Sequence, residues 1–301
     1  MDYIVRGLDI LNFGGESILG FLGHNNFEFI KGDIRKKSDI EKSIEGIDAV
    51  IHLAAIVGDP ACAKQQTLAE ETNWTASKYL YDVCQSYNKI KRFIFTSTCS
   101  NYGKMKEEKY VNENSPLRPI SFYARLKVKF EEYILKNKTR NSFFPTSLRF
   151  STVYGLSPRM RFDLTVNEFV RDLACGREIE IYGEKFWRPY CHIEDIANSI
   201  IKVLESPSDK IDHNVFNVGD TNENYQKRMI ADEIMKIIPF AKIKYVYKSE
   251  DPRDYKVEFS KISKVLGFRI TKTLPIGIRE INSSINSGLF LNPYSSKYKN
   301  I

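Results

Sequence analysis

The chain has 301 residues and a formal net charge of +7, from 45 lysines and arginines against 38 aspartates and glutamates. Its basic residues are interleaved with acids, as in KKSDIEK and KMKEEK, which favours a solvated surface over a nucleic-acid-binding stripe. No apolar run approaches the roughly 20 residues of a membrane span, and the N-terminus lacks the pattern of a secretory signal. Five scattered cysteines without a CxxC pair favour reduced thiols in a cytoplasm over disulfides or a metal site.

In the first half of the chain, short β-rich runs alternate with longer helical stretches. The expected strands are YIVRGLD (3–9), FEFIKGD (27–33), AVIHLAA (49–55), RFIFTST (92–98) and TSLRFSTVYG (146–155). The expected helices are 67–88 and 122–137, where apolar residues recur with 3.6-residue spacing. Apolar strands that alternate with helices predict a parallel, doubly wound α/β sheet covered on both faces.

The second half has a more mixed pattern. Strands are expected at IEIYG and NVFNVGD, and helices near 163–175, 194–205, 224–237 and 275–287. No internal repeat or low-complexity linker divides the chain. The tail NPYSSKYKNI is expected to fray, as chain termini commonly do.

A tyrosine and a lysine lie four residues apart in YARLK. Tyr123 and Lys127 therefore share a helix face. An ammonium near a phenol lowers the phenol pKa from about 10, so Tyr123 could exchange a proton with a substrate hydroxyl near neutral pH. Because Tyr87–Lys91 and Tyr102–Lys106 have the same spacing, the pattern alone predicts no more than an exposed helical pair.

The strand RFIFTST, upstream of Tyr123, ends in hydroxyl residues. Open α/β sheets bind ligands at the carboxyl ends of their strands, so Thr98 could contact the same substrate oxygen that Tyr123 deprotonates. A strand-end threonine by itself is usually a turn former. Its combination with the helical tyrosine and lysine is much more specific.

The motifs STCSNYG, SFYARLK, LRFSTVYG and WRPYCHIEDIA occur in this order. In them the chain resembles the extended short-chain dehydrogenase/reductases, and within these the NAD-dependent epimerase/dehydratases that act on nucleotide sugars. The resemblance extends from Tyr3 to about Gly288. It implies a Rossmann-like cofactor domain, 1–155 plus about 188–220, and a smaller mixed α/β substrate-binding lobe, 156–187 and 221–301.

The resemblance also implies roles for individual residues. Thr98, Tyr123 and Lys127 would be catalytic, and Tyr123 and Lys127 would also contact NAD. The other cofactor-binding residues would be Asp9 at the ribose, Asp33 and Ile34 at the adenine, Leu53, Ala54 and Ala55 beneath the cofactor, and Asn73 supporting the active-site strand. The substrate-binding residues would be Thr152, Asp251 and Arg188, the last at the diphosphate. Each has a plainer alternative as a turn residue, a close-packed alanine, a satisfied helix amide or a surface ion-pair partner.

Two departures from the family pattern concern the substrate: Thr152 stands where an asparagine is frequent, and Lys248 where an arginine is frequent. Relatives that eliminate water carry Asp-Glu directly after the catalytic threonine, and decarboxylases carry a glutamate two places after it. Here those places hold Cys99 and Ser100, which disfavours both reactions. Epimerisation through a 4-keto sugar is the simplest remaining reaction, and ketosugar reduction, a non-catalytic scaffold and an RNA-binding relative stay as alternatives.

A dinucleotide-binding fold needs a strand, a GxxGxxG loop and a helix whose N-terminus meets the pyrophosphate. GGESILGFLG (14–23) has four glycines, but no helix follows it, and Asp9 precedes the loop instead of following by about 20 residues. Residues 3–9 therefore match the second strand of the order 3-2-1-4-5-6, and the first strand, loop and helix are missing from the pattern. We expect the second and fourth strands to face a gap or to be forced together, and NAD to bind weakly or not at all.

Extended members of this family often form homodimers through the helix with the tyrosine–lysine pair and the helix before it. In this chain those helices are 121–137 and 67–87. The resemblance therefore implies a homodimer that acts on a nucleotide sugar, for example in polysaccharide synthesis, with no nucleic-acid or membrane partner.

Overall fold

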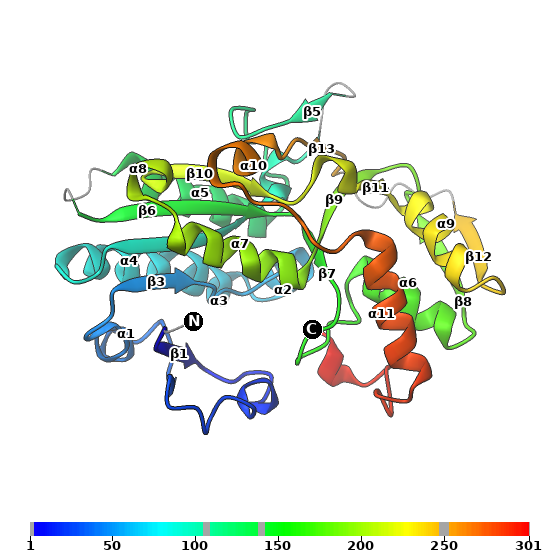
Figure 1. Ribbon diagram of the computed structural model, residues 1–301, viewed down its shortest axis with the longest axis horizontal. Helices are drawn as coiled ribbons and strands as arrows, with labels where there is room; N and C mark the ends of the chain where they lie inside the picture. The colour runs from blue at the N-terminus through cyan, green and yellow to red at the C-terminus, as the bar shows by residue number, and fades with distance from the viewer. Residues whose placement is uncertain (1–2, 105–108, 138–141, 247–252, 301) are drawn as a thin grey trace.

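The computed structural model describes residues 3–104, 109–137, 142–246 and 253–300, shown as ribbons in Figure 1. A four-stranded parallel sheet lies at the centre of the larger lobe. Its strands, in spatial order, are β10 (Asn214–Val218), β6 (Phe144–Phe150), β4 (Arg92–Thr98) and β3 (Ala49–His52). A separate parallel pair consists of β1 (Val5–Asp9) and β2 (Phe27–Lys31).

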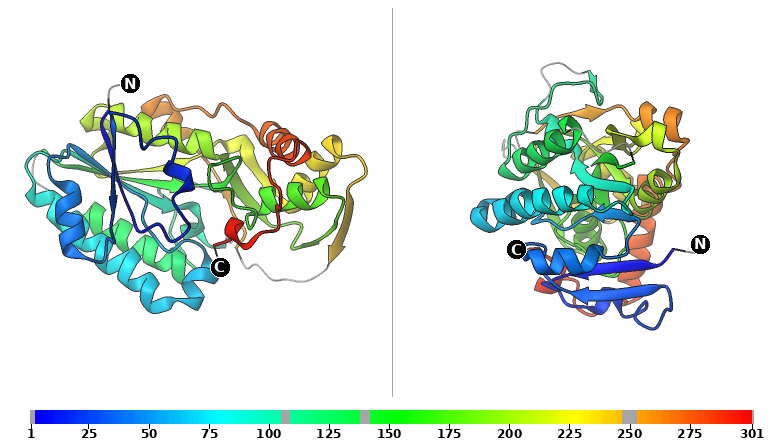
Figure 2. Two further views of the ribbon diagram at one scale, coloured as in Figure 1. Left: turned by 90° about the horizontal axis from the view of Figure 1, so that it is seen from below. Right: turned by 90° about the vertical axis from the view of Figure 1, so that its left-hand side faces the viewer.

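Helices cover both faces of the central sheet (Figures 1 and 2). They are α1 (Lys37–Ile44), α4 (Ser77–Ser86) and α5 (Phe122–Lys136) on one face, and α7 (Ile193–Glu205) and α10 (Ser260–Leu266) on the other. Strand β4 contributes side chains to the hydrophobic core on each face of the sheet, because successive side chains of a strand point to opposite faces. Phe93 and Phe95 pack under α4 and α5, whereas Ile94 packs against α7. The expected doubly wound, Rossmann-like parallel sheet is confirmed.

Short elements complete the larger lobe. They are α2 (Asp59–Lys64), α3 (Gln66–Glu70), the π-helical turn η2 (Glu71–Ala76), α8 (Ser208–Ile211), the 3-10 turns η1 (Glu16–Ile18) and η3 (Cys99–Tyr102), and the two-stranded pair β5 (Tyr110–Val111) and β13 (Lys256–Val257). The helix expected at 67–88 is thus present, with a π-helical turn inside it, and the helix expected at 122–137 is α5.

A smaller lobe has its own hydrophobic core. Its elements are β7 (Thr152–Tyr154), β8 (Glu178–Tyr182), β9 (Trp187–His192), β11 (Asn224–Gln226), β12 (Lys242–Val246), α6 (Thr165–Ala174), α9 (Lys227–Ile237), α11 (Leu274–Asn286) and the 3-10 turns η4 (Thr221–Glu223) and η5 (Ser296–Tyr298). The run expected as one strand over 146–155 is two strands that meet at Ser151. Strand β6 belongs to the central sheet, whereas β7 pairs with β9, so this run connects the two lobes.

The C-terminal tail is ordered up to Asn300, so the expectation that it frays is wrong. The Tyr298 ring packs edge-on against Phe162 and Phe290, with ring centroids 5.3 and 5.6 Å apart. The backbone N–H of Phe162 also donates to the Tyr298 carbonyl at 3.0 Å. Aromatic burial against the core of the smaller lobe offsets the entropy cost of ordering the tail.

Strands β1 and β3 are held apart. No ladder joins them among the described residues, and each has one hydrogen-bonded neighbour, β2 and β4 respectively. Val5 of β1 is 53% exposed and Ile51 of β3 is 40% exposed, which is unusual for apolar residues of a doubly wound sheet. The Arg6 guanidinium fixes β1 to the end of α1 through the Glu45 carbonyl at 2.7 Å. We expected the second and fourth strands of the family order, which are β1 and β3 here, either to face a gap or to be forced together. The structure separates them.

A buried ion pair joins helix α5 to the central sheet. Glu131 of α5 and Arg149 of β6 lie 2.6 Å apart, with side chains 1% and 5% exposed. Ser147 donates to the same carboxylate at 2.8 Å, and Arg149 donates to the Tyr102 hydroxyl at 2.9 Å. Tyr102 in turn donates to Asn217 of β10 at 2.8 Å. This network satisfies both charges and holds α5, β6, β10 and η3 in a fixed relation.

We predict that Glu131→Ala lowers the free energy of unfolding by roughly 3–5 kcal/mol, because it leaves the Arg149 charge buried without a counter-charge. Urea unfolding followed by circular dichroism measures this loss. The double variant Glu131→Leu/Arg149→Met removes both buried charges and should recover most of the stability. A Glu131→Ala protein that unfolds at the wild-type urea midpoint would contradict the prediction.

Candidate active site

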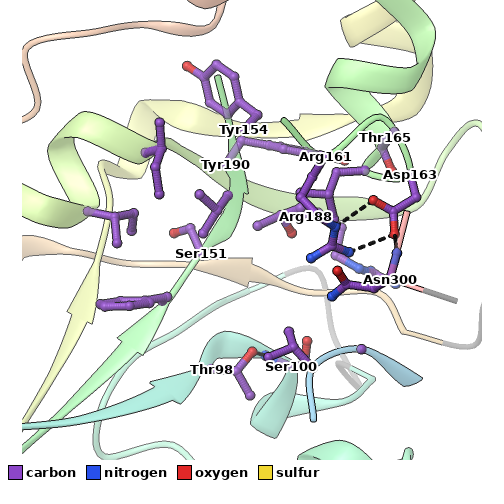
Figure 3. Close-up of a pocket in the computed structure, with 18 of the residues that line it drawn as sticks. Thr98, Ser100, Ser151, Tyr154, Arg161, Asp163, Thr165, Arg188, Tyr190 and Asn300 are labelled. Atoms are coloured by element: carbon purple, nitrogen blue, oxygen red, sulfur yellow. Dashed lines mark hydrogen bonds and ion pairs between the residues drawn. The ribbon is translucent and has the colours of Figure 1, made fainter. Parts of the chain in front are cut away.

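A cavity of about 790 Å³ lies where the two lobes meet (Figure 3). We call it the central cavity. Its walls come from the carboxyl ends of β4 and β6, from β7, from the first turns of α5 and α7, and from the loop that precedes α6. This is the edge at which doubly wound sheets bind ligands, because loops diverge there and leave a crevice.

Thr98, Tyr123 and Lys127 all line the central cavity. Thr98 is the last residue of β4, and its Oγ1 accepts a hydrogen bond from the Ser100 N–H at 3.1 Å. That bond begins the turn η3 and fixes the Thr98 side chain, whose hydroxyl hydrogen can still be donated. Tyr123 and Lys127 lie one turn apart on α5, which begins at Phe122 because Ser121 caps it through the Ala124 N–H. The three residues therefore share one site, although they come from two elements.

The Lys127 ammonium is buried and has one strong hydrogen bond. Its Nζ donates to the Thr96 carbonyl at 2.7 Å and lies 4.8 Å from the centroid of the Phe95 ring and 5.9 Å from that of Tyr123. The side chain is 4% exposed. Burial disfavours the charged form and lowers the pKa of Lys127 to about 8.

Burial also governs Tyr123, in the opposite direction. It raises the pKa of the Tyr123 phenol well above 10, and the nearby Cys62 and Asp59 raise it further, while Arg161 lowers it. The expectation that Lys127 lowers this pKa is therefore wrong for the structure, since the desolvation of a phenolate outweighs the attraction of one ammonium. The phenol holds its proton at neutral pH unless more positive charge enters the cavity.

We predict that Lys127→Met stabilises the fold while removing activity. The difference between the usual 10.5 and about 8 means that a charged Lys127 costs roughly 3 kcal/mol at pH 7. The hydrogen bond to Thr96 offsets part of this cost, so we expect a gain of about 1–2 kcal/mol in the free energy of unfolding.

The pH dependence of this gain has a definite sign. Below pH 8 both folded and unfolded lysines are charged, and the gain is full. Between pH 8 and 10.5 the unfolded chain binds more protons, so wild-type stability rises relative to the variant and the gain disappears. Urea unfolding at pH 7, 9 and 10.5 tests this, with Lys136→Met on the exposed side of α5 as the control. A variant less stable than wild type at pH 7 would overturn it.

Two expected substrate residues also line the central cavity, namely Thr152 and Arg188. Thr152 begins β7, directly after the break at Ser151. Arg188 is 9% exposed, donates to the Trp187 carbonyl at 2.7 Å, and places its guanidinium 5.0 Å from the centroid of the Tyr255 ring. These contacts fix the Arg188 side chain in the cavity wall.

Most of the expected cofactor residues lie elsewhere. Of the expected cofactor-binding residues, Leu53 lines the central cavity together with Tyr123 and Lys127. The Leu53 side chain is 58% exposed. Those outside the cavity are Asp9, Asp33, Ile34, Ala54, Ala55 and Asn73. Asp251 and Lys248 lie outside the described residues.

The contacts of these residues explain their positions. Asp9 accepts from the Leu11 N–H at 2.6 Å, as a strand-end turn residue does. Asp33 pairs with Arg35, whose hydrogen bonds lower the pKa of that carboxyl. Ile34 is buried in the core under α4, and Ala54 packs against the same core.

Asn73 supports a different segment from the expected one. Its amide accepts from the Ile56 N–H at 2.8 Å and donates to the Ile56 carbonyl at 2.9 Å. It therefore fixes the loop after β3, and not the active-site strand β4. The reason is that the π-helical turn η2 directs this side chain toward the loop.

The sequence interpretation missed charged residues from three separate segments. Arg159, Arg161 and Asp163 from the loop before α6 line the central cavity, as do Asp59 and Arg253. Arg161 holds Asp163 with two hydrogen bonds, of 2.6 and 2.8 Å, and Arg253 lies 2.7 Å from Asp59. The run SPRMRFD, directly after the LRFSTVYG motif, was the signal that could have revealed the first three.

The positions that carry acids in dehydrating or decarboxylating relatives are not acidic here. Cys99 is buried, its thiol donates to the Arg149 carbonyl at 3.3 Å, and burial raises its pKa above the usual range. Ser100 lines the central cavity. Two carboxylates, Asp59 and Asp163, do reach this cavity from other segments, and each is paired with an arginine.

The central cavity fits the nicotinamide half of NAD better than the pyrophosphate half. Ile196 and Ile200 of α7 give it an apolar wall opposite Tyr123 and Lys127. The glycines of 14–23 lie in the connection from β1 to β2, do not line the cavity, and adjoin a 3-10 turn of three residues. The described residues therefore offer no glycine-rich helix N-terminus for a pyrophosphate.

We predict that the 301-residue chain binds NAD more weakly than micromolar, because the pyrophosphate usually supplies much of the affinity through backbone N–H groups. Isothermal titration calorimetry of the purified chain measures this. A dissociation constant in the micromolar range or below would contradict the prediction.

Within the described residues, no helix is long and apolar enough to cross a membrane, and no cluster of three or more histidine, cysteine or acidic side chains could hold a metal ion.

The profile of the NAD dependent epimerase/dehydratase family matches residues 3–219. The chain therefore belongs to this family of enzymes. YtcB of Bacillus subtilis, whose name describes an uncharacterized UDP-glucose epimerase, is 30% identical over 194 residues, which are 64% of this chain and 60% of the relative. UDP-glucuronate 4-epimerase 3 of Arabidopsis thaliana is 24% identical over 269 residues, which are 83% of this chain and 62% of the relative. The matches thus span less than two thirds of either relative.

Solved structures of sugar-nucleotide enzymes share the fold. UDP-glucose 4-epimerase from Thermotoga maritima, solved with UDP-glucose, has a TM-score of 0.83 at 23% identity over 95% of this chain and 92% of that chain. UDP-glucuronic acid 4-epimerase from Bacillus cereus, solved with UDP-glucuronic acid and NAD, has a TM-score of 0.79 at 25% identity over 95% of this chain and 91% of that chain.

Proposed function

We propose that this protein is an NAD-dependent nucleotide-sugar epimerase that acts through a 4-keto intermediate. The observation that carries the proposal is the convergence of Thr98, Tyr123 and Lys127 on one cavity, with Arg188 in its wall. A strand-end hydroxyl, a phenol and a buried ammonium are the groups needed to move a proton on and off a sugar hydroxyl. A binding module has no need for such a set.

The chemistry assigns a role to each side chain. NAD bound beside Tyr123 and Lys127 would supply the acceptance and return of a hydride. Tyr123 takes the proton of the sugar 4-hydroxyl and later gives it back, while Thr98 donates a hydrogen bond to the same oxygen. Lys127 holds the phenolate by its charge and is itself fixed through Thr96.

Epimerisation fits the site better than water elimination. Elimination needs an acid and a base beside the catalytic threonine, where Cys99 and Ser100 stand. Asp59 and Asp163 each have an arginine partner. Burial raises the pKa of Asp163, but the hydrogen bonds and charge of Arg161, with backbone hydrogen bonds, together hold it below its usual range, which disfavours a role as acid. Returning the hydride to the other face of the keto sugar requires only the three residues already described.

We propose that the smaller lobe binds the nucleotide sugar and the larger lobe the cofactor. The expected bounds, 156–187 and 221–301 against 1–155 and about 188–220, differ from the structure in that β9 belongs to the smaller lobe and α10 to the larger one. Arg188 supplies positive charge suited to a diphosphate. The relatives' substrates, UDP-glucose and UDP-glucuronic acid, are therefore the first compounds to test. A homodimer through α4 and α5 is proposed from the family resemblance alone.

We predict that Tyr123→Phe lowers turnover by at least about 100-fold, because it removes the group that exchanges the proton. The assay incubates UDP-glucose and UDP-glucuronic acid with protein and a high concentration of NAD, and detects the 4-epimers by chromatography. Tyr87→Phe is the matched control, since Tyr87–Lys91 has the same spacing but lies outside the central cavity.

Two results would change the proposal. Full turnover by Tyr123→Phe would remove Tyr123 from its role. Stoichiometric oxidation of NADH with a 4-keto sugar, without epimer formation, would replace the epimerase with a ketosugar reductase.

A further inference from the structure

We infer that the C-terminal tail is part of the substrate site, and that the Asn300 side chain binds an uncharged hydrogen-bonding group of the nucleotide sugar. This inference rests on the proposed function, because it names a further contact in the same cavity. Figure 3 shows the Asn300 amide beneath the Arg161–Asp163 pair, extending toward the middle of the cavity.

Backbone atoms, and not the Asn300 side chain, fix the tail to the smaller lobe. Arg159 donates to the Lys299 carbonyl at 3.0 Å, and the Asn300 N–H donates to the Asp163 carboxylate at 3.1 Å. Tyr298 completes the attachment by packing against Phe162. The segment from Tyr298 to Asn300 is therefore positioned at the cavity wall before any ligand binds.

Two buried polar atoms near this attachment have no hydrogen-bond partner in the part of the chain that the structure describes. They are the amide oxygen Oδ1 of Asn300 and the Nε of Arg159, and both residues line the central cavity. A buried polar group without a partner destabilises a fold, so its presence in a cavity wall indicates a group that a ligand satisfies.

A purely structural role for the Asn300 side chain does not explain this arrangement. The amide oxygen of this side chain has no hydrogen-bond partner within the described residues, and the tail is held by other contacts. If the amide served the fold, its oxygen would be paired like that of Asn167, which accepts from the Gly155 N–H at 3.0 Å. The Asn300 oxygen is available to a ligand instead.

The local charges indicate what kind of group binds. The Asp163 carboxylate neutralises Arg161 through two hydrogen bonds, so this pair carries little net charge to attract a phosphate. The unsatisfied atoms are one acceptor, on Asn300, and one donor, on Arg159. A group that both donates and accepts is complementary to them, such as a hydroxyl of the hexose or the amide edge of the base.

The test measures binding of UDP-glucose, UDP-glucuronic acid, dTDP-glucose and UDP to the full chain and to Asn300→Ala by isothermal titration calorimetry. We expect Asn300→Ala to weaken binding of the preferred nucleotide sugar roughly 5- to 50-fold, because a buried ligand group loses its partner. Weakening of the nucleotide sugar with UDP unaffected assigns the contact to the hexose, and equal weakening of both assigns it to the nucleotide.

Thermal unfolding of the same proteins separates a binding role from a structural one. Because Asn300→Ala removes an unsatisfied buried acceptor, its unfolding midpoint should equal or exceed that of wild type. Asn286→Ala, at an exposed position near the end of α11, is the control and should change neither binding nor stability.

Failure of this inference can be distinguished from failure of the proposed function. Unchanged affinity in Asn300→Ala, with clear binding by wild type, overturns this inference and leaves the proposed function intact. A lower unfolding midpoint with weakened binding overturns it in favour of a structural role. Failure of the wild-type chain to bind any of the four compounds overturns the proposed function, and this contact with it.

Discussion

The buried ion pair between Glu131 and Arg149 is the interaction on which the site depends. It joins the helix that carries Tyr123 and Lys127 to the strand that leads to Ser151 and the second lobe. Because both charges are almost fully buried, neither has water as an alternative partner, and the geometry that satisfies them is narrowly defined. Electrostatics as well as apolar packing therefore set the distance between α5, which carries Tyr123, and the end of β6.

Burial has a second consequence, in the electrostatics of the site itself. It lowers the pKa of Lys127 and raises that of Tyr123, so burial disfavours the charged form of each residue in the folded chain. An enclosed site holds such groups at a cost in stability, and that cost is typical of catalytic residues.

The proposed substrate side and the proposed cofactor side of the cavity differ in the contacts that the described residues provide. The substrate side has Arg188, the loop around Arg161, and a tail pinned by backbone hydrogen bonds and aromatic contacts. On the cofactor side, β1 and β3 each leave one edge unpaired among the described residues, and exposed apolar side chains such as Val5 and Ile51 lie along them. The glycines of 14–23 do not compensate, since they lie away from the cavity.

The sequence alone determined the doubly wound fold and pointed to Thr98, Tyr123 and Lys127, which the structure brings to one cavity, because periodicity and motif spacing are local properties of the chain. It did not reveal Asp59, Arg161, Asp163 or Asn300, whose common cavity arises from long-range packing of separate loops and the tail. It also gave the wrong direction for the pKa of Tyr123, since helical spacing reports which groups are near but not how deeply they are buried. Residue spacing showed which groups are neighbours along the chain. Only the tertiary structure decided how deeply these groups are buried and which distant segments meet.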